Sequence, residues 1–183
     1  MNNFLFGFTH LVLLFATSCG DQKAAVSDKP GVDVTVLVTQ TSAYCGGAAP
    51  NKEITDRMNT PRPVDGKNVF VALGDMNEAN DEIVFRGVTD KDGKVRMNIA
   101  PGTYYLVFDN KSDKNYYNEL VKTYGQATAY YSVIDKDCLD QWFRNPELIM
   151  QVDAQHTEFS VNVYQPCEWN AIPCAQYNGP LPP

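Results

Sequence analysis

Four cysteine side chains could carry out sulfur chemistry in the body of this chain: Cys45, Cys138, Cys167 and Cys174. A four-thiolate zinc site uses closely spaced pairs of the type C-x₂₋₄-C, and none of these cysteines has a partner at that spacing. An even number of cysteines in an oxidising compartment is typical of disulfides. We therefore predict two disulfides and no bound metal, and cysteines that are paired cannot act as nucleophiles.

Histidine, the commonest general base and metal ligand, is nearly absent from the chain. Of the two histidines, His10 lies in the apolar N-terminal run and His156 lies in a polar turn beside Asp153. This supply is too small for a Ser-His-Asp or Cys-His catalytic site. We interpret His156 as a solvated turn residue, and we expect neither a cofactor nor a histidine-based activity.

Carboxylates are the remaining catalytic candidates, because two of them can act as the acid and base of a glycosidase. The close groupings are Asp90/Asp92, Asp109/Asp113, Asp135/Asp137 and Glu78/Asp81/Glu82. Nothing in the sequence marks any of them as buried, so we interpret them as solvated turn residues. The Asp90-Lys-Asp92-Gly93 run contains part of a calcium loop but lacks its third acidic ligand and its distant Glu. A carboxylate-based hydrolase using the 110–147 segment is the least favoured functional hypothesis.

Aromatic side chains are the better candidates for ligand contact. The binding hypothesis names Tyr116, Tyr117, Tyr130, Tyr131, Trp142 and Trp169. Tyr and Trp are favoured contact residues in recognition surfaces, but rings in long segments also pack into small cores. If these rings bind a ligand, several should line one concave surface beside Trp169, near polar groups such as Asp140 and Arg144. If they only pack, they should point inward against the disulfides.

The N-terminal segment predicts where the chain is sent. The apolar run from Phe4 to Phe15 is too short to span a membrane as a helix, and the small residues before Cys19 lead directly into polar sequence. It resembles a bacterial lipoprotein signal, which implies that Cys19 becomes the lipidated first residue. An ordinary cleaved signal is the alternative, since Ala16 stands where that family usually has Leu and no basic residue precedes Lys23. The resemblance implies a signal peptide over 1–18 and an envelope protein held in the membrane by lipid, on the periplasmic face or the cell surface.

Composition narrows the range of partners. The formal net charge is −7, and no cluster of Lys and Arg occurs anywhere in the chain. A nucleic acid or an anionic lipid headgroup would require such a basic cluster, so we expect no nucleic-acid partner. Residues 19–31 are small and polar and read as a flexible tether. The chain after the signal is long enough for one domain with its own core.

Alternating apolar residues predict short strands separated by turns. Val32, Val34, Val36 and Val38 alternate with more polar residues, which is typical of a half-buried strand. Similar patterns predict strands over 32–39, 69–73, 83–89, 95–99, 103–109, 148–152 and 157–164. The Asp92-Gly93 pair supplies a tight turn. The pattern indicates an all-β fold, a seven-stranded antiparallel sandwich.

The long segment between the fifth and sixth strands predicts helix, because a loop of that length is uncommon in a compact domain. Asp137 is a candidate N-cap for a helix running through Leu139, Trp142 and Phe143, which Pro146 would end. The fold class is therefore a sandwich with a partly helical insertion between strands five and six.

Three blocks carry a family resemblance: Thr60–Val71, Thr89–Gly93 with Ile99–Tyr105, and Val152–Thr157. They resemble the opening, the hairpins and the last turn of prealbumin-like sandwiches, and are similar to carboxypeptidase regulatory-like and Cna-B-like domains. The resemblance implies the fold and says little about function. Two enzyme families that share this sandwich, intradiol dioxygenases and hydroxyisourate hydrolases, need several histidines. The second also needs a Tyr-Arg-Gly-Ser ending, which this chain lacks.

Successive connections in an antiparallel sandwich alternate between its two ends, which sorts the chain into two poles. We call the end where the first strand begins the near pole and the opposite end the far pole. The sandwich then spans 32–166, with insertions 41–62 and 110–147 and the tail 167–183 at the far pole together with the turn 91–94. The connections 74–82, 100–102 and 153–156 belong to the near pole.

All four cysteines after Cys19 therefore fall at the far pole. Short spacing favours a Cys167–Cys174 disulfide, which would leave Cys45–Cys138 to join the two insertions. The other two pairings stay open, because spacing does not determine connectivity.

These inferences predict a non-catalytic module, anchored at the envelope, with a binding or structural role. We expect it to contact a protein through the far pole. The alternative is a carbohydrate-binding module of the starch-binding-like type, in which exposed rings at one pole stack on sugar faces.

Overall fold

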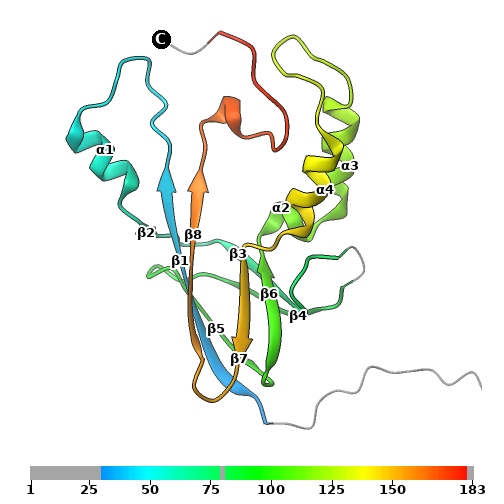
Figure 1. The fold of residues 1–183 in the computed structure, drawn as a ribbon. Helices are drawn as coiled ribbons and strands as arrows, with labels where there is room; N and C mark the ends of the chain where they lie inside the picture. The colour runs from blue at the N-terminus through cyan, green and yellow to red at the C-terminus, as the bar shows by residue number, and fades with distance from the viewer. Residues whose placement is uncertain (1–29, 79–80, 181–183) are drawn as a thin grey trace, which may run out of the picture.

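The computed structural model describes residues 30–78 and 81–180, so the signal segment, Cys19 and most of the predicted tether lie outside the described residues. Two sheets pack face to face (Figure 1). In the first sheet, β1 is the central strand; its members are β1 (Val32–Ser42), β2 (Arg62–Pro63), β5 (Lys94–Ile99) and β8 (Glu158–Gln165). The second sheet has the order β4 (Ile83–Val88), β3 (Asn68–Leu73), β6 (Gly102–Val107) and β7 (Leu148–Val152).

The predicted all-β sandwich is confirmed. Each of the seven predicted strands is present, and the short β2 is added where the chain crosses from α1 (Lys52–Asn59) toward β3. The pairs are antiparallel except β1 with β8, which run parallel from Thr35↔Glu158 to Ser42↔Gln165. Both strands run from the near pole to the far pole, so neighbours in one sheet must be parallel there.

The core lies between the two sheets and explains the alternating sequence. Val34, Val36 and Val38 of β1 are buried, and they face Val71 and Leu106 of the second sheet within one cluster. Burying each such side chain stabilises the fold by roughly 1.5–3 kcal/mol. The intervening residues of β1 point to the outer face, which is why Asp33, Thr35 and Thr39 can be polar.

Gly93 occupies the predicted tight turn between β4 and β5 for a steric reason. Its φ is 74°, in the left-handed region, and a Cβ there would lie 2.5 Å from the carbonyl oxygen of Val38. The carbonyl of Gly93 accepts a hydrogen bond from the Val38 N–H at 2.8 Å. A larger residue would therefore push the turn away from β1.

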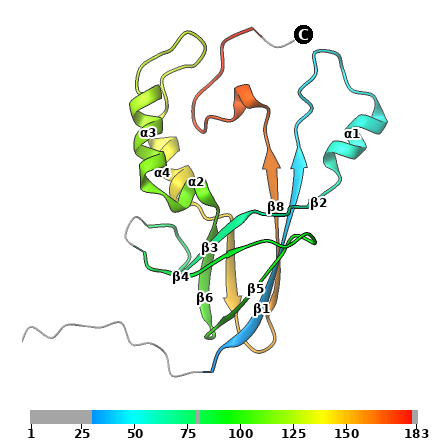
Figure 2. The ribbon, with the colours of Figure 1, turned by 180° about the vertical axis from the view of Figure 1, so that it is seen from behind.

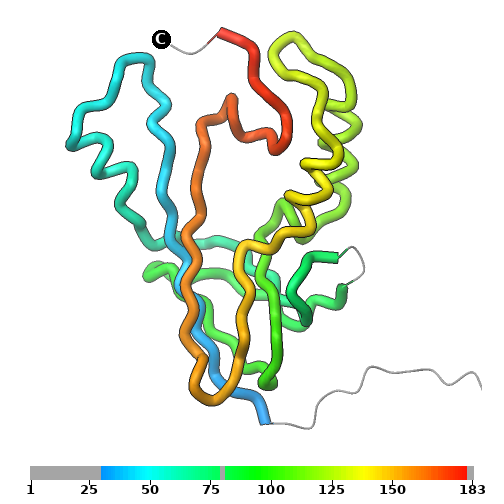
Figure 3. The backbone as a smooth tube through the Cα atoms, in the orientation of Figure 1, coloured from blue at the N-terminus to red at the C-terminus, as the bar shows by residue number. Residues whose placement is uncertain are grey.

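The elaborations gather at the far pole, as predicted (Figures 1 and 3). The turned view shows the same arrangement, with the start of β1 and the β7–β8 turn at the opposite end (Figure 2). The far-pole elements are α1, α2 (Asp109–Ser112), α3 (Lys114–Tyr124), α4 (Lys136–Arg144) and η1 (Glu168–Asn170). We call residues 109–147 together with 166–180 the cap.

One connection does not follow the predicted poles. The loop after β3, predicted at the near pole, folds back over the outer face of the second sheet and reaches the cap. Its buried Asn77 donates from Nδ2 to the carbonyls of Lys111 and Phe143, both at 2.9 Å, and its backbone N–H donates to Arg144 O at 2.9 Å. The Tyr105 hydroxyl, on that outer face, donates to Asp81 at 2.8 Å. The connection is long enough to fold back over the Tyr105 ring. The alternation of connections between the two poles does not take such a fold-back into account.

Local capping corrects the predicted helix. The N-cap of α4 is Asp135 and not Asp137, because the Asp135 carboxylate accepts from the Cys138 N–H at 3.0 Å. The helix ends at Arg144, just before Pro146, as predicted. Helices α1 and α3 were not predicted; Asn51 and Asp113 cap them by accepting from backbone N–H groups of their first turns.

Candidate binding cleft at the far pole

Two disulfides hold the far pole together, as predicted, but the favoured pairing is wrong. The bonds are Cys45–Cys167 and Cys138–Cys174. Cys45 follows β1 and Cys167 follows β8, and parallel neighbours leave a sheet side by side. The Ala43 N–H continues their ladder by donating to Gln165 O at 2.8 Å. Spacing along the chain could not show this, because it depends on which strands are paired.

The second disulfide ties the tail to α4. The Asp135 N–H donates to the carbonyl of Cys174 at 2.9 Å beside the Cys138–Cys174 bond. Leu120, Ile134 and Leu139 form a buried cluster under this link, separate from the sandwich core. Aromatic side chains of α3 and α4 and the tail residue Ile172 pack around it. The cap is therefore a small domain-like unit with its own core and its own covalent link.

A cleft lies between the cap and the far end of β8. Its volume is about 470 Å³. The lining residues are Lys67, Phe108, Asn110, Lys111, Tyr116, Trp142, Glu147, Asn162, Val163, Tyr164, Pro166, Asn170, Ala171 and Pro173. Helices α2 to α4 supply one wall, β8 and the tail supply the other, and Lys67 and Phe108 extend from the sandwich. Aromatic and aliphatic surface with a few amides and charges is typical of ligand clefts of this size.

Lys111 is the most unusual side chain in the cleft, because it is a lysine that is only 6% exposed. Its ammonium donates to the carbonyl of Asn145 at 2.7 Å and pairs with Glu147 at 2.9 Å. It also lies 4.8 Å from the centroid of the Trp142 ring, a cation–π distance. A buried charge needs such partners to offset the loss of water. Lys111 thereby fixes the end of α4 and the orientation of Trp142.

The six predicted contact residues divide into two groups. Tyr116 and Trp142 line the cleft together, with ring centroids 6.4 Å apart and an angle of 47° between the planes. Tyr117, Tyr130, Tyr131 and Trp169 lie elsewhere in the cap, although Asn170, next to Trp169, does line the cleft. Two of the six rings therefore share one concave surface, and their role in binding stays a prediction.

Three of the other four rings pack against neighbours. Tyr117 lies edge-on to Phe143 and donates its hydroxyl to Asp140. Tyr131 contacts Tyr124 and Tyr177, and the exposed Tyr130 lies against Tyr177. The predicted polar partners are also occupied away from the cleft: Asp140 by Tyr117, and Arg144 by Glu78 at 3.5 Å.

The hydroxyl of Tyr116, one of the cleft residues, is held in its neutral form. Burial, with a smaller contribution from Tyr124, raises the pKa of Tyr116. Outside the cleft, the hydrogen bond to Asp140 raises the pKa of Tyr117 in the same direction. At neutral pH the Tyr116 hydroxyl is therefore an uncharged donor and acceptor, suited to contact rather than to acid–base chemistry.

Sequence reasoning missed Lys111, Phe108 and Tyr164 as cleft residues. Tyr164 stands at an outward position of the last predicted strand and is 62% exposed, so alternation could have identified it as a surface aromatic. No sequence signal distinguishes Lys111 from other lysines. Its burial depends on the closeness of α2 to the end of α4.

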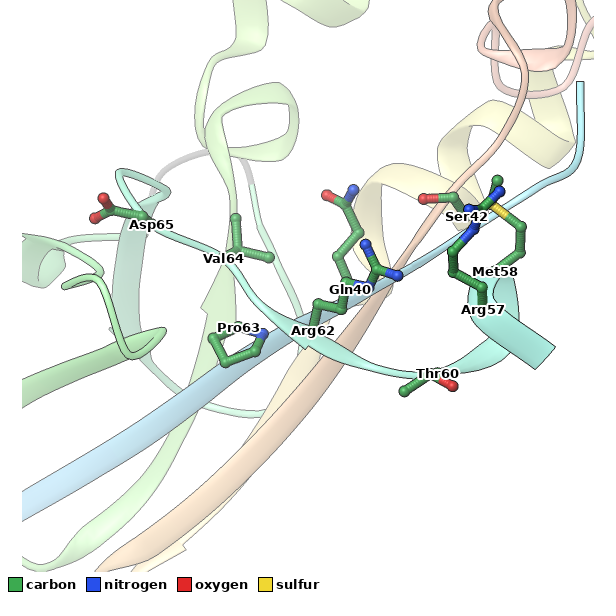
Figure 4. A pocket seen from close by; sticks show the side chains of 9 residues that line it. All are labelled: Gln40, Ser42, Arg57, Met58, Thr60, Arg62, Pro63, Val64 and Asp65. Carbon is green, nitrogen blue, oxygen red and sulfur yellow. The ribbon is translucent and has the colours of Figure 1, made fainter. Parts of the chain in front are cut away.

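A second hollow, of about 360 Å³, lies between α1, β2 and β1 (Figure 4). Gln40 and Arg62 lie on paired residues of β1 and β2, and Arg57 and Met58 come from the end of α1. This hollow contains no aromatic ring, so the far-pole cleft is the stronger candidate site.

Other chemistry is limited in the described ranges, 30–78 and 81–180. They contain no group of three or more His, Cys, Asp or Glu side chains placed to hold a metal ion. They also contain no helix with the length and apolar character needed to cross a membrane. His156 lies on the near-pole turn, with Nδ1 2.9 Å from a carboxylate oxygen of Asp153.

No family model and no curated protein matches the sequence. Among solved structures, the chain is similar to GBS52, the minor pilin of Streptococcus agalactiae, at 10% identity and a TM-score of 0.32, over 75% of this chain and 44% of that one. It is also similar to a double mutant of the shaft pilin SpaA from Lactobacillus rhamnosus GG, at 10% identity and a TM-score of 0.33, over 74% and 50%. The chain thus spans half or less of each pilin chain. Likeness at this distance concerns general architecture and carries nothing about function.

Proposed function

We propose that this chain is a non-catalytic binding module, anchored to a bacterial envelope through a lipidated Cys19, that binds a segment of another protein in the far-pole cleft. The cleft is lined by far-pole residues, at the pole opposite the start of β1, where the predicted tether joins the sandwich. A lipid anchor at the near pole would therefore leave the cleft facing away from the membrane.

The observation that carries this proposal is the construction of the cleft. Its two walls come from segments that are far apart in sequence, and the Cys138–Cys174 bond joins α4 to the tail that forms part of the opposite wall. The Lys111 ammonium lies over the Trp142 ring and holds its orientation. A surface held in this way loses little conformational entropy when it binds, and aromatic anchors contribute much of the binding energy of protein interfaces.

The cleft suits a protein segment better than a sugar. Sugar stacking needs a flat open ring face, whereas Trp142 has Lys111 near its face and Tyr116 tilted beside it. Phe108, Val163 and Pro166 add apolar surface to the lining, beside a few amides and charges. Apolar and aromatic side chains of a peptide fill such a space.

The test compares Trp142→Ala, inside the cleft, with Trp169→Ala, a matched substitution outside it. The purified full chain is screened against a phage-displayed library of random linear peptides and, in parallel, against a glycan array. We expect peptides to be enriched, and Trp142→Ala to weaken their binding at least tenfold while Trp169→Ala leaves it unchanged.

Two outcomes would contradict the proposal. Enrichment of glycans that depends on Trp142, with no enriched peptide, would favour the carbohydrate-binding alternative. Peptide binding that is equally sensitive to both substitutions, or to neither, would remove the cleft as the binding site.

A further inference from the structure

Strand β8 is paired on one side only. In the part of the chain that the structure describes, its one ladder partner is β1. The carbonyls of Thr157 and Gln165 accept from the N–H groups of Thr35 and Ala43, both at 2.8 Å. Because backbone groups of successive residues point to opposite sides of a strand, the odd-numbered residues of β8 face β1.

The even-numbered residues consequently direct their N–H and C=O groups away from the sheet. For Ser160, Asn162 and Tyr164, none of these backbone groups has a hydrogen-bond partner among the described residues. The Asn162 side chain is used on the outer face, where it bonds to Thr39 and Thr41 of β1. A row of unpaired donors and acceptors of this kind is a template for another strand.

Other strand edges carry several features that discourage such pairing, whereas the one charge on β8 is that of Glu158 at its first position. Strand β5 carries Lys94 and Arg96, the β3–β4 pair shifts register between Val71 and Ala72, and β7 is only five residues long. Strand β8 contains no Pro, Lys or Arg, and its register with β1 has no irregularity. Charges, bulges and short edges are the usual protection against added strands.

The open edge of β8 leads into the cleft. Asn162, Val163 and Tyr164 form part of its wall, opposite Tyr116 and Trp142. Both ribbon views show β8 extending further toward the far pole than β7, so the sandwich does not cover this stretch (Figures 1 and 2). The cleft beside this stretch has a volume of about 470 Å³, which suits a short extended segment better than the edge of a second sandwich.

We infer that the cleft binds an extended segment of a partner protein as an additional strand on β8, a deepening that rests on the proposed function. The backbone of the segment pairs with Ser160, Asn162 and Tyr164. Every second side chain then faces the cap, where Trp142 and Tyr116 favour an aromatic or aliphatic residue. Main-chain hydrogen bonds supply affinity in this mode, and the alternate side chains supply specificity.

The test removes one outward N–H without touching the β1 ladder. Tyr164→Pro removes both the tyrosine side chain and the outward backbone N–H. Tyr164→Ala removes the same side chain and retains the N–H. The probe is the set of linear peptides enriched on the wild-type chain. We expect Tyr164→Pro to bind them about tenfold more weakly than Tyr164→Ala, as for loss of one or two hydrogen bonds.

A second measurement leaves the protein unaltered. Each backbone nitrogen of an enriched peptide is methylated in turn, which removes one donor at a time. Strand addition predicts that affinity falls at every second position, because only alternate donors face β8. This pattern is independent of any effect of proline on folding.

The outcomes separate this inference from the proposed function. Peptides that need Trp142 but bind Tyr164→Pro and Tyr164→Ala equally, with no alternation on methylation, would overturn strand addition and leave the cleft as the site. A wild-type chain that dimerises in sedimentation while Tyr164→Pro stays monomeric would assign the edge to a second copy and overturn the inference. Failure to enrich any peptide would overturn both.

Discussion

The sandwich and the cap are stabilised in different ways. The sandwich buries a continuous apolar cluster from both sheets and contains no disulfide between its strands. The cap has a small cluster around Leu120, Ile134 and Leu139, and it depends on the Cys138–Cys174 bond and on buried polar contacts such as those of Lys111. A structure of this kind can vary its cap while it keeps its scaffold. The following experiments test that separation.

The largest effect is expected from the disulfide that follows the two parallel strands, β1 and β8. Replacing Cys45 and Cys167 by serine should lower the free energy of unfolding by about 5 kcal/mol, because the bond closes a long loop in the unfolded chain. Denaturant titration with circular dichroism measures the change. The Cys138→Ser, Cys174→Ser pair is the matched control and should loosen the cap while the sheets stay folded. Equal sheet destabilisation by both pairs would contradict the separation.

Truncation of a core leucine comes next. Leu106→Ala should cost about 3 kcal/mol in global unfolding, since its side chain is fully buried between the sheets. Leu139→Ala removes the same atoms from the cap cluster, and we expect faster amide hydrogen exchange in α3 and α4 with little change in β1 and β6. If both variants accelerate exchange equally in the sheets, the cap and the sandwich form one cooperative unit.

The contact between the two regions predicts an intermediate effect. Asn77→Ala leaves the carbonyls of Lys111 and Phe143 without their donor, and should cost about 2 kcal/mol. Exchange of the amides around α2 and the end of α4 reports the loss. Asn118→Ala, on the exposed side of α3, is the control and should change nothing measurable. An unchanged exchange pattern in Asn77→Ala would show that the loop does not couple the regions.

The smallest effect concerns the near-pole turn, far from the cap. The His156 side chain, followed by the N–H groups of Gln155 and His156, holds the pKa of Asp153 below its ordinary value of 3.8. A lowered pKa means that this contribution to stability is present above the ordinary value and is lost as pH falls through the lowered one. His156→Ala should raise the Asp153 midpoint in an NMR titration. Asp90, whose pKa the Lys94 N–H lowers most, should not move.

The sandwich was predictable because local sequence patterns indicate its strands and turns. Val34, Val36 and Val38 alternate with outward residues, and Asp92-Gly93 marks a turn whatever the rest of the chain does. The order of the strands within each sheet was harder to predict. The parallel β1–β8 pair decided the Cys45–Cys167 bond, and that pair depends on contacts between residues more than a hundred positions apart.

The cap was harder to predict for the same physical reason. Helix α3 did leave a signal in the sequence. Tyr116, Leu120 and Tyr124 are spaced four residues apart on one face, and the capping residue Asp113 precedes them. Helix α1 has no buried residue and gave little pattern to detect. The cleft itself is formed by distant segments, so its aromatic composition was foreseeable and its geometry was not.

The Cys45–Cys167 bond also determines how the molecule would carry mechanical load. A pull between the N-terminal and C-terminal ends of the described chain runs along β1 to Cys45 and crosses the disulfide to Cys167 before it enters the tail. The chain between these cysteines, which are 122 positions apart, is bypassed and stays slack. The load therefore follows the covalent backbone of β1, and the hydrogen bonds that β1 makes to β5 and β8 are not in series with it. A protein of this design transmits tension through one strand and one disulfide, with most of its fold outside the line of force.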